Sequence, residues 1–251
     1  MKTALQAIRS LVFIAVMYLS MAVIGLVYLL PTLLTEDGAF RAIHAYCRSV
    51  RWAARVIVGL RSEIRGDVPS DEVIIASKHQ SFFDIILIVS AVPRPKFIMK
   101  KELASTPIVA FYGRKTGSIP VDRGKRGMAV KKMVADVKAG RARPGQLIIF
   151  PQGTRVAAGA HLPYKIGTGV LYRETGQKVI PAATNVGVFW KRHGIMRWPG
   201  TAVVEFLPAI EPGLEMPDFM ARLEEAVEAK SNRLMAEAGF EMAEVAQVAE
   251  D

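Results

Sequence analysis

The segment VIIASKHQSFFD, residues 73–84, decides the fold that we predict for this chain. Its first residues form a short apolar run that is typical of a buried strand. Ser81 and Asp84 have the spacing of a helix N-cap pair, so a helix is predicted to begin at Ser81. His79 then lies in the connecting loop, where Asp84 can accept a hydrogen bond from one imidazole nitrogen and leave the other free to take a proton.

The H-x4-D pattern has two interpretations when it is taken alone. The more common one is structural: Asp84 caps the helix and His79 packs in the loop. In the other, His79 is a general base and Asp84 is the group that orients it. A metal site is not expected, because no other His, Cys or carboxylate stands at ligand spacing. A serine hydrolase is not expected either, because the chain has no G-x-S-x-G motif.

Beyond Arg65, short β-branched runs alternate with helical stretches, and this alternation predicts an α/β fold. The predicted strands are residues 73–77, 96–99, 118–121, 146–150, 178–182 and 201–207, and the predicted helices are residues 81–91, 127–139, 167–175 and 218–238. We expect one catalytic domain over residues 66–240 and a frayed tail over residues 241–251. Cys47 is the only cysteine, which excludes an internal disulfide.

Residues 1–65 are predicted to attach the chain to a membrane. Residues 11–30 carry no charge and, at about 1.5 Å per residue, reach the ~30 Å of a hydrocarbon core. A cleaved signal peptide is disfavoured, because the run is long and no clear A-x-A site follows it. Residues 40–65 alternate arginines with apolar residues, which is typical of a basic helix on anionic headgroups. The arginine excess on this side predicts a cytoplasmic catalytic domain, and leaves open whether the anchor spans the bilayer or dips into it.

Three further clusters of candidate site residues each combine a predicted strand with the residues that follow it. They are Gly117–Arg123, Gln146–Arg155 and Lys178–Asn185. Each arginine taken singly is more often a solvated surface charge. Loops at the carboxyl ends of strands in an α/β sheet converge on one crevice, however, so His79, Arg123 and Arg155 are expected to lie near one another. The 33 basic against 23 acidic residues favour an anionic partner, and the two arginines are candidate phosphate ligands.

The H-x4-D pattern and the three clusters form four sequence blocks, and their order resembles that of the glycerolipid acyltransferase family. The match covers residues 70–190, and the pieces between the blocks that also resemble family positions are Lys100–Leu103, Pro107, Gly113 and Tyr164–Gly167. Four blocks in the right order are far more specific than any one of them. The resemblance implies a mixed central sheet flanked by helices, with an N-terminal membrane-embedded helical segment.

The resemblance also implies a reaction. His79 would take the proton of an acceptor hydroxyl, which attacks an acyl thioester, while Asp84 orients the imidazole. The implied transfer runs from acyl carrier protein or coenzyme A to the sn-2 hydroxyl of lysophosphatidic acid, giving phosphatidic acid in phospholipid biosynthesis. No metal and no resident cofactor are implied, because the thioester is a co-substrate. The expected partners are acyl carrier protein and the anionic surface of the inner membrane, and no nucleic acid.

The remaining site residues are expected around the acceptor. By resemblance, those that bind its phosphate are Arg155, Arg123 and Lys100, and those that position it are Gln152, Gly153 and Thr154. The chain departs from the family at Gln152, where a glutamate is usual, so this side chain can hydrogen-bond a hydroxyl but cannot act as a base. It departs again at Lys78, where asparagine is common.

Two alternatives stay open at this point. The acceptor could be another lysolipid, such as a lyso-ornithine lipid, or glycerol 3-phosphate. In a different functional class, a non-enzymatic basic module that only tethers to acidic lipids explains the charge and the anchor. That module leaves the arrangement of His79 and Asp84 unexplained.

Overall fold

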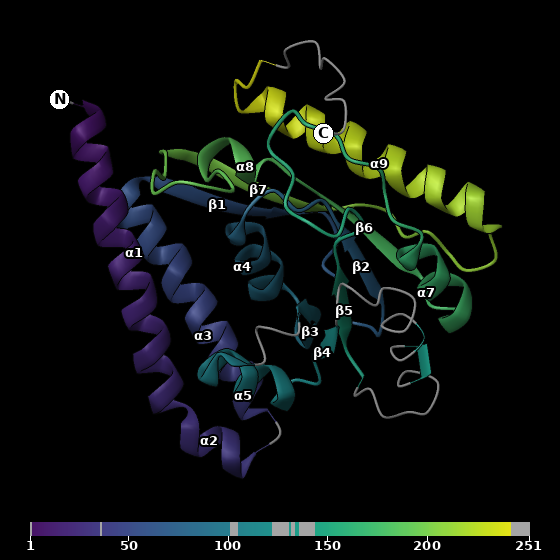
Figure 1. Cartoon of the computed structure of the whole chain (residues 1–251), viewed down its shortest axis with the longest axis horizontal. Helices are drawn as coiled ribbons and strands as arrows, with labels where there is room; N and C mark the ends of the chain where they lie inside the picture. Colours follow the sequence, from purple (N-terminus) through teal and green to yellow (C-terminus); the bar gives the residue numbers. More distant parts are fainter. Residues whose placement is uncertain are drawn as a thin grey trace.

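A seven-stranded sheet forms the centre of the molecule, with helices on both of its faces (Figure 1). The computed structural model describes residues 2–35, 37–100, 105–121, 131, 134–135 and 144–241. The strands are β1 Leu60–Arg65, β2 Ile74–Ser77, β3 Pro95–Lys100, β4 Ile119–Val121, β5 Gln146–Ile149, β6 Val179–Thr184 and β7 Gly200–Phe206. The helices are α1 Lys2–Val27, α2 Leu29–Leu34, α3 Gly38–Ala53, α4 Phe82–Ala91, α5 Pro107–Lys115, α7 Gly167–Thr175, α8 Val186–Phe189 and α9 Met216–Glu237, with a π-helical turn η1 at Ala54–Val58.

The sheet is mixed, as the resemblance implied, and its strand order is β1-β7-β6-β2-β5-β3-β4. Strands β2 to β6 are all parallel to one another, whereas β7 runs antiparallel to β6 and β1 runs parallel to β7. The carboxyl ends of the five parallel strands therefore meet at one edge of the sheet. The loops after β2, β5 and β6 lie next to one another there, because β2 pairs with both of the other strands.

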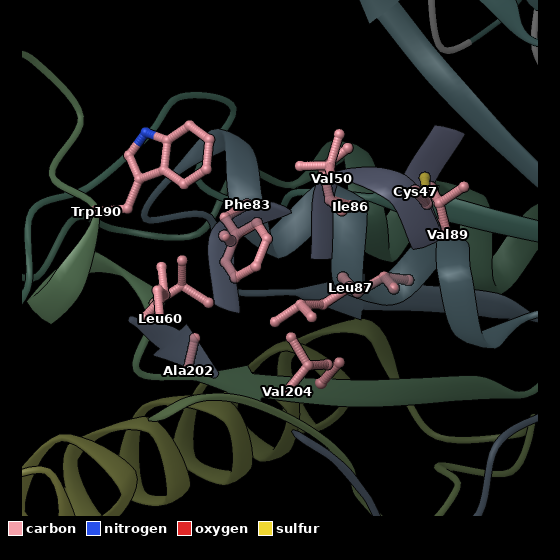
Figure 2. Packing of buried hydrophobic residues seen from close by; sticks show 14 of the residues in the cluster. Cys47, Val50, Leu60, Phe83, Ile86, Leu87, Val89, Trp190, Ala202 and Val204 are labelled. Carbon is pink, nitrogen blue, oxygen red and sulfur yellow. The ribbon is translucent and has the colours of Figure 1, made fainter. Parts of the chain in front are cut away.

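One face of the sheet is covered by α1, α3 and α4, which enclose the larger hydrophobic core. Figure 2 shows Phe83 and Leu87 of α4 pointing toward Leu60 of the edge strand β1 and Val204 of its neighbour β7, with Trp190 beside Phe83. The Phe83 and Trp190 rings stack with their centroids 5.3 Å apart, and both side chains are buried. This packing fixes the first turn of α4, which follows directly on the loop that carries His79.

Helices α7 and α9 cover the opposite face and form a second core with β2, β5 and β6. Tyr172 of α7 and Phe219 of α9 stack at 3.9 Å between centroids, with their planes 6° apart. The apolar stripe of α9 continues through Leu223 and Val227, and both are fully buried. A charged residue on the flank of this helix, Glu228, is thereby held against the loops at the carboxyl edge.

The N-terminal segment forms a helical hairpin in which α3 packs back along α1 (Figure 1). Helix α1 is long and apolar enough to cross a membrane, by length and composition. It is also bonded to the catalytic domain near both of its ends. Gln6 Nε2 donates to Arg197 O at 2.6 Å near the start, and Gly25 O accepts from the Tyr112 hydroxyl at 2.8 Å near the end.

The basic helix expected over residues 40–65 is confirmed as far as Val58, and the prediction is wrong for residues 60–65. The helical segment ends at Val58, and Leu60–Arg65 form β1, whose side chains alternate between the core and solvent before the strand ends. Gly59 is the physical reason, because its left-handed conformation (φ 76°) ends the helix as a C-terminal glycine commonly does. The sheet therefore begins at Leu60, before the domain boundary expected after residue 65.

The other predicted elements agree with the structure to within a few residues. Helices α5 and α8 have no counterpart among the predicted elements. Of the helix expected over residues 127–139, only residues 131 and 134–135 are described, and these are helical. The tail expected over residues 241–251 lies outside the described residues after Glu241.

Candidate active site

The predicted pairing of His79 with Asp84 is present in the structure. His79 Nδ1 lies 2.9 Å from Asp84 Oδ1, and the Asp84 side chain is fully buried while 13% of the His79 side chain is exposed. His79 lies in the loop after β2 and Asp84 in the first turn of α4, which is what allows two residues five apart to meet. The imidazole is therefore held by Asp84 through Nδ1, and it remains partly exposed to solvent.

The second carboxylate oxygen of Asp84 caps the helix. Asp84 Oδ2 accepts from the backbone N–H groups of Gln80 and Ser81, each at 2.7 Å, and Ser81 Oγ accepts from Phe83 N at 3.4 Å. The expected capping box is thus present. Because Asp84 already accepts from two backbone N–H groups through Oδ2, we infer that it also accepts from His79 through Oδ1, with the proton on Nδ1. Nε2 is then an acceptor, and no hydrogen bond to it occurs among the described residues.

The loop after β5 forms the neighbouring wall of the site. Phe150 stacks on the His79 ring with a centroid distance of 3.9 Å and an interplanar angle of 20°. Val156 N donates to His79 O at 2.7 Å, so the loop after β5 contacts both the ring and the backbone of His79. Gly153 has a φ of 71°, a conformation that favours glycine, and the Lys165 side chain packs against it.

Gln152 is fixed in one orientation at the base of this loop. Its Nε2 donates to Leu162 O at 3.3 Å and to Glu228 Oε1 at 3.4 Å, so the amide cannot be flipped without losing both bonds. Its Oε1 is buried and has no hydrogen-bond partner among the described residues. A buried acceptor without a partner is rare in a folded protein, and it marks Gln152 as a candidate for binding a substrate donor.

Glu228 of α9 organises the interior of the site. Its Oε2 forms an ion pair with Lys78, which is 1% exposed, and its Oε1 accepts from the Tyr164 hydroxyl at 3.0 Å as well as from Gln152. Burial next to this carboxylate raises the pKa of Tyr164, so the phenol stays a donor. Lys78 also donates to Ala160 O at 3.4 Å.

The two departures from the family pattern therefore meet at one carboxylate. A glutamate at position 152 would place a second negative charge about where Gln152 Nε2 now approaches Glu228 Oε1. The neutral amide avoids that repulsion and supplies a donor, while Lys78 supplies the counter-charge. The sequence did not indicate this cluster, because Glu228 lies on a helix 150 residues from Lys78.

The candidate phosphate ligands are only partly visible. Arg155 is half-buried, and its Nη1 donates to Arg192 O at 3.2 Å. Arg123 lies outside the described residues, and so does the side chain of Lys100, whose backbone ends β3. Thr154 is half-buried in the same loop as Arg155. Arg155 precedes Val156, whose backbone N–H donates to His79 O, so the Arg155 backbone lies next to the His79 loop.

The cluster at Lys178–Asn185 has a structural role. Asn185 Oδ1 accepts from Val203 N at 2.7 Å, and its Nδ2 donates to Thr201 O and Leu234 O at 3.3 and 3.2 Å. Asn185 thus ties the end of β6 to β7 and α9. Within the described part of the chain, no group of three His, Cys, Asp or Glu side chains is arranged to hold a metal ion.

Comparisons with known proteins point in one direction. The family model described as Acyltransferase matches residues 60–185, just over half of the chain. The 1-acyl-sn-glycerol-3-phosphate acyltransferase of Pseudomonas aeruginosa is 29% identical over 239 residues, which cover 94% of this chain and 93% of that protein. The mouse 1-acyl-sn-glycerol-3-phosphate acyltransferase alpha is 27% identical over 180 residues, 69% of this chain and 63% of that protein.

A solved structure has the same fold. The crystal structure of the 1-acyl-sn-glycerophosphate (LPA) acyltransferase PlsC from Thermotoga maritima gives a TM-score of 0.78 over 94% of this chain and 100% of that chain, at 20% sequence identity. At this identity the likeness concerns the fold. It confirms the predicted arrangement of a mixed sheet flanked by helices.

The role of Glu228 can be tested by stability. Glu228→Gln leaves the Lys78 ammonium buried without a counter-charge, and should lower the free energy of unfolding by about 3 kcal/mol. Denaturant titration of the detergent-solubilised protein measures this change. Glu224→Gln, one turn earlier on α9, is the matched control: Glu224 pairs with the exposed His161, so the loss should be below about 1 kcal/mol.

Adding Lys78→Asn to Glu228→Gln should recover part of the lost stability, because the double variant no longer buries an unpaired charge. Equal effects of Glu228→Gln and Glu224→Gln would contradict the organising role of Glu228.

Proposed function

Because this chain belongs to the acyltransferase family, we propose that it transfers a fatty acyl group from a thioester to the sn-2 hydroxyl of lysophosphatidic acid. The observation that carries this proposal is the contact of 2.9 Å between His79 Nδ1 and Asp84 Oδ1, on a partly exposed imidazole. The names of the Pseudomonas and mouse relatives support the choice of acceptor. The product is phosphatidic acid.

The proposed mechanism uses His79 as a general base and then as a general acid. Its Nε2 removes the proton of the acceptor hydroxyl as the oxygen attacks the thioester carbonyl carbon. The tetrahedral intermediate collapses with cleavage of the carbon–sulfur bond, and the imidazolium returns the proton to the departing thiolate. Asp84 accepts from Nδ1 throughout, which stabilises the imidazolium and keeps the ring in its orientation.

The acceptor is held by the loop after β5. The unpartnered Oε1 of Gln152 can accept from a hydroxyl of the glycerol, and the Arg155 guanidinium binds the phosphate. Arg123 and Lys100 stay proposed phosphate ligands by resemblance. Holding the phosphate at this loop keeps the hydroxyl close to the imidazole and so contributes proximity.

The donor is proposed to be the thioester of acyl carrier protein or coenzyme A. Either one leaves as a thiol, so the reaction needs no resident cofactor. Both are made in the cytosol, and both are anionic, in keeping with the formal net charge of +10 on this chain.

We propose that the N-terminal hairpin enters the inner membrane from the cytoplasmic side and returns to the cytoplasmic side without crossing the bilayer. Gln6 and Gly25, near opposite ends of α1, both bond to the catalytic domain, which a helix crossing the bilayer alone could not do. Large apolar side chains are exposed along the length of α1, Leu5, Leu19 and Leu26 among them. Exposed arginines of the neighbouring segment, such as Arg48 and Arg55, can meet anionic headgroups.

Activity of purified protein tests the enzymatic proposal. His79→Ala should lower turnover of lysophosphatidic acid by about 10²–10⁴-fold, because it removes the base, and Asp84→Asn should also lower turnover because it removes the orienting acceptor. His161→Ala is the matched control, since the His161 side chain is half exposed and pairs with Glu224.

The assay should compare lysophosphatidic acid with a lyso-ornithine lipid and glycerol 3-phosphate, each with both thioester donors. Preference for the phosphate-free lysolipid would overturn the proposed acceptor. Equal turnover by wild type and His79→Ala would overturn the mechanism and favour a lipid-tethering module.

The hairpin topology can be tested by labelling. Thr3→Cys should react with a membrane-impermeant maleimide from the same side of the membrane as Glu225→Cys on α9, in oriented vesicles. Cys47 is buried, so the native thiol should contribute little labelling. Reaction of the two introduced cysteines from opposite sides would show that α1 spans the bilayer.

A further inference from the structure

The loop over residues 190–199, which follows α8, brings a second arginine next to Arg155. Arg192 Nη1 donates to Arg155 O at 3.1 Å, and Arg155 Nη1 donates to Arg192 O at 3.2 Å. The two side chains therefore cross, and each guanidinium lies beside the backbone of the other residue. The sequence did not indicate this pairing, because the two arginines are 37 residues apart.

The loop is held in place at several points, so Arg192 is not on a free segment. Trp190 is buried, and the Arg197 guanidinium lies over its ring at 4.2 Å from the centroid. Arg197 N donates to Ser10 Oγ of α1 at 3.0 Å, and Trp198 N donates to Phe189 O at 2.9 Å. These contacts fix the two ends of the loop against the core and against α1.

The charge of the pair is uncompensated within the described residues. Neither Arg155 nor Arg192 forms an ion pair with a carboxylate there, and the neighbours of Arg192 in the loop, Lys191 and His193, add exposed basic groups. Two adjacent cations repel each other unless an anion lies between them. A phosphate monoester fits this need, because arginine donates to phosphate oxygens in a bidentate manner and a dianion can engage two guanidinium groups.

The arginine pair is also linked through the backbone to His79, the proposed general base. Val156, which follows Arg155, donates its N–H to His79 O at 2.7 Å, so the backbone of Arg155 is one residue away from a direct contact with His79. A phosphate held by both arginines would keep the attached glycerol beside His79.

We propose that Arg192 binds the acceptor's phosphate together with Arg155 and so favours acceptors that carry a phosphate monoester. This inference rests on the proposed function. Arg192 is a binding residue here, in direct contact with substrate, and does not act through Arg155 alone.

The test measures KM for lysophosphatidic acid in neutral detergent micelles, which remove the attraction of anionic lipid. Arg192→Ala should raise KM by about tenfold or more, because a charge-assisted hydrogen bond to phosphate is lost. Arg192→Lys should recover part of this loss. Lys191→Ala and His193→Ala are the matched controls in the same loop, and each should change KM by less than about twofold.

A double-mutant comparison separates direct binding from positioning. Arg192→Ala should raise KM in the Arg155→Ala background as well, because its own contact with phosphate is lost. No change in that background would mean that Arg192 only positions Arg155, and would overturn the inference. An unchanged KM in the otherwise wild-type protein would overturn it too. Absence of acyl transfer by the wild type would overturn the proposed function, and the inference with it.

Discussion

The buried carboxylate of Asp84 is the constraint on which the rest of the site depends. It accepts from His79 Nδ1 and from the backbone N–H groups of Gln80 and Ser81, all at 2.7–2.9 Å. A buried charge is tolerated only when such bonds replace its hydration, and each bond to a charged group contributes about 1.5–3 kcal/mol. One side chain therefore caps the start of helix α4, shapes the loop after β2 and contacts the imidazole whose tautomer it is proposed to set. Asp84 therefore serves both the fold of this region and the proposed chemistry.

The neighbouring loops become an active site through contacts between segments that are distant in sequence. Glu228 of α9 pairs with Lys78 and accepts a hydrogen bond from the Gln152 amide nitrogen. The amide oxygen of Gln152 has no partner among the described residues and is proposed to bind the substrate. In the neighbouring loop, Arg192 crosses Arg155. The interior cluster thus has balanced charge, whereas Arg155 and Arg192 form no ion pair with a carboxylate among the described residues. This division suits a lipid whose anionic headgroup stays at the surface while its hydroxyl reaches inward.

Sequence reasoning succeeded where the determining interactions are local. His79 and Asp84 are five residues apart, and the spacing of Ser81 and Asp84 already indicates the helix start. It failed for residues 60–65, because arginines at helical spacing continue past Val58; Gly59 was the available signal that the helix ends. Glu228 and Arg192 could not have been predicted, since their partners lie 150 and 37 residues away and only the packing of α9 and the loop after α8 brings them together.

The most direct measurement is the protonation of the His79 ring nitrogens by ¹⁵N NMR of histidine-labelled protein at neutral pH. The chain has four histidines, and the spectrum of His79→Ala identifies the signals of this one. The account predicts a protonated Nδ1 and an unprotonated Nε2 in the wild type, and loss of this preference in Asp84→Asn. A protonated Nε2 in the neutral ring, or the same tautomer in Asp84→Asn, would contradict the claim that Asp84 prepares His79 to accept a proton.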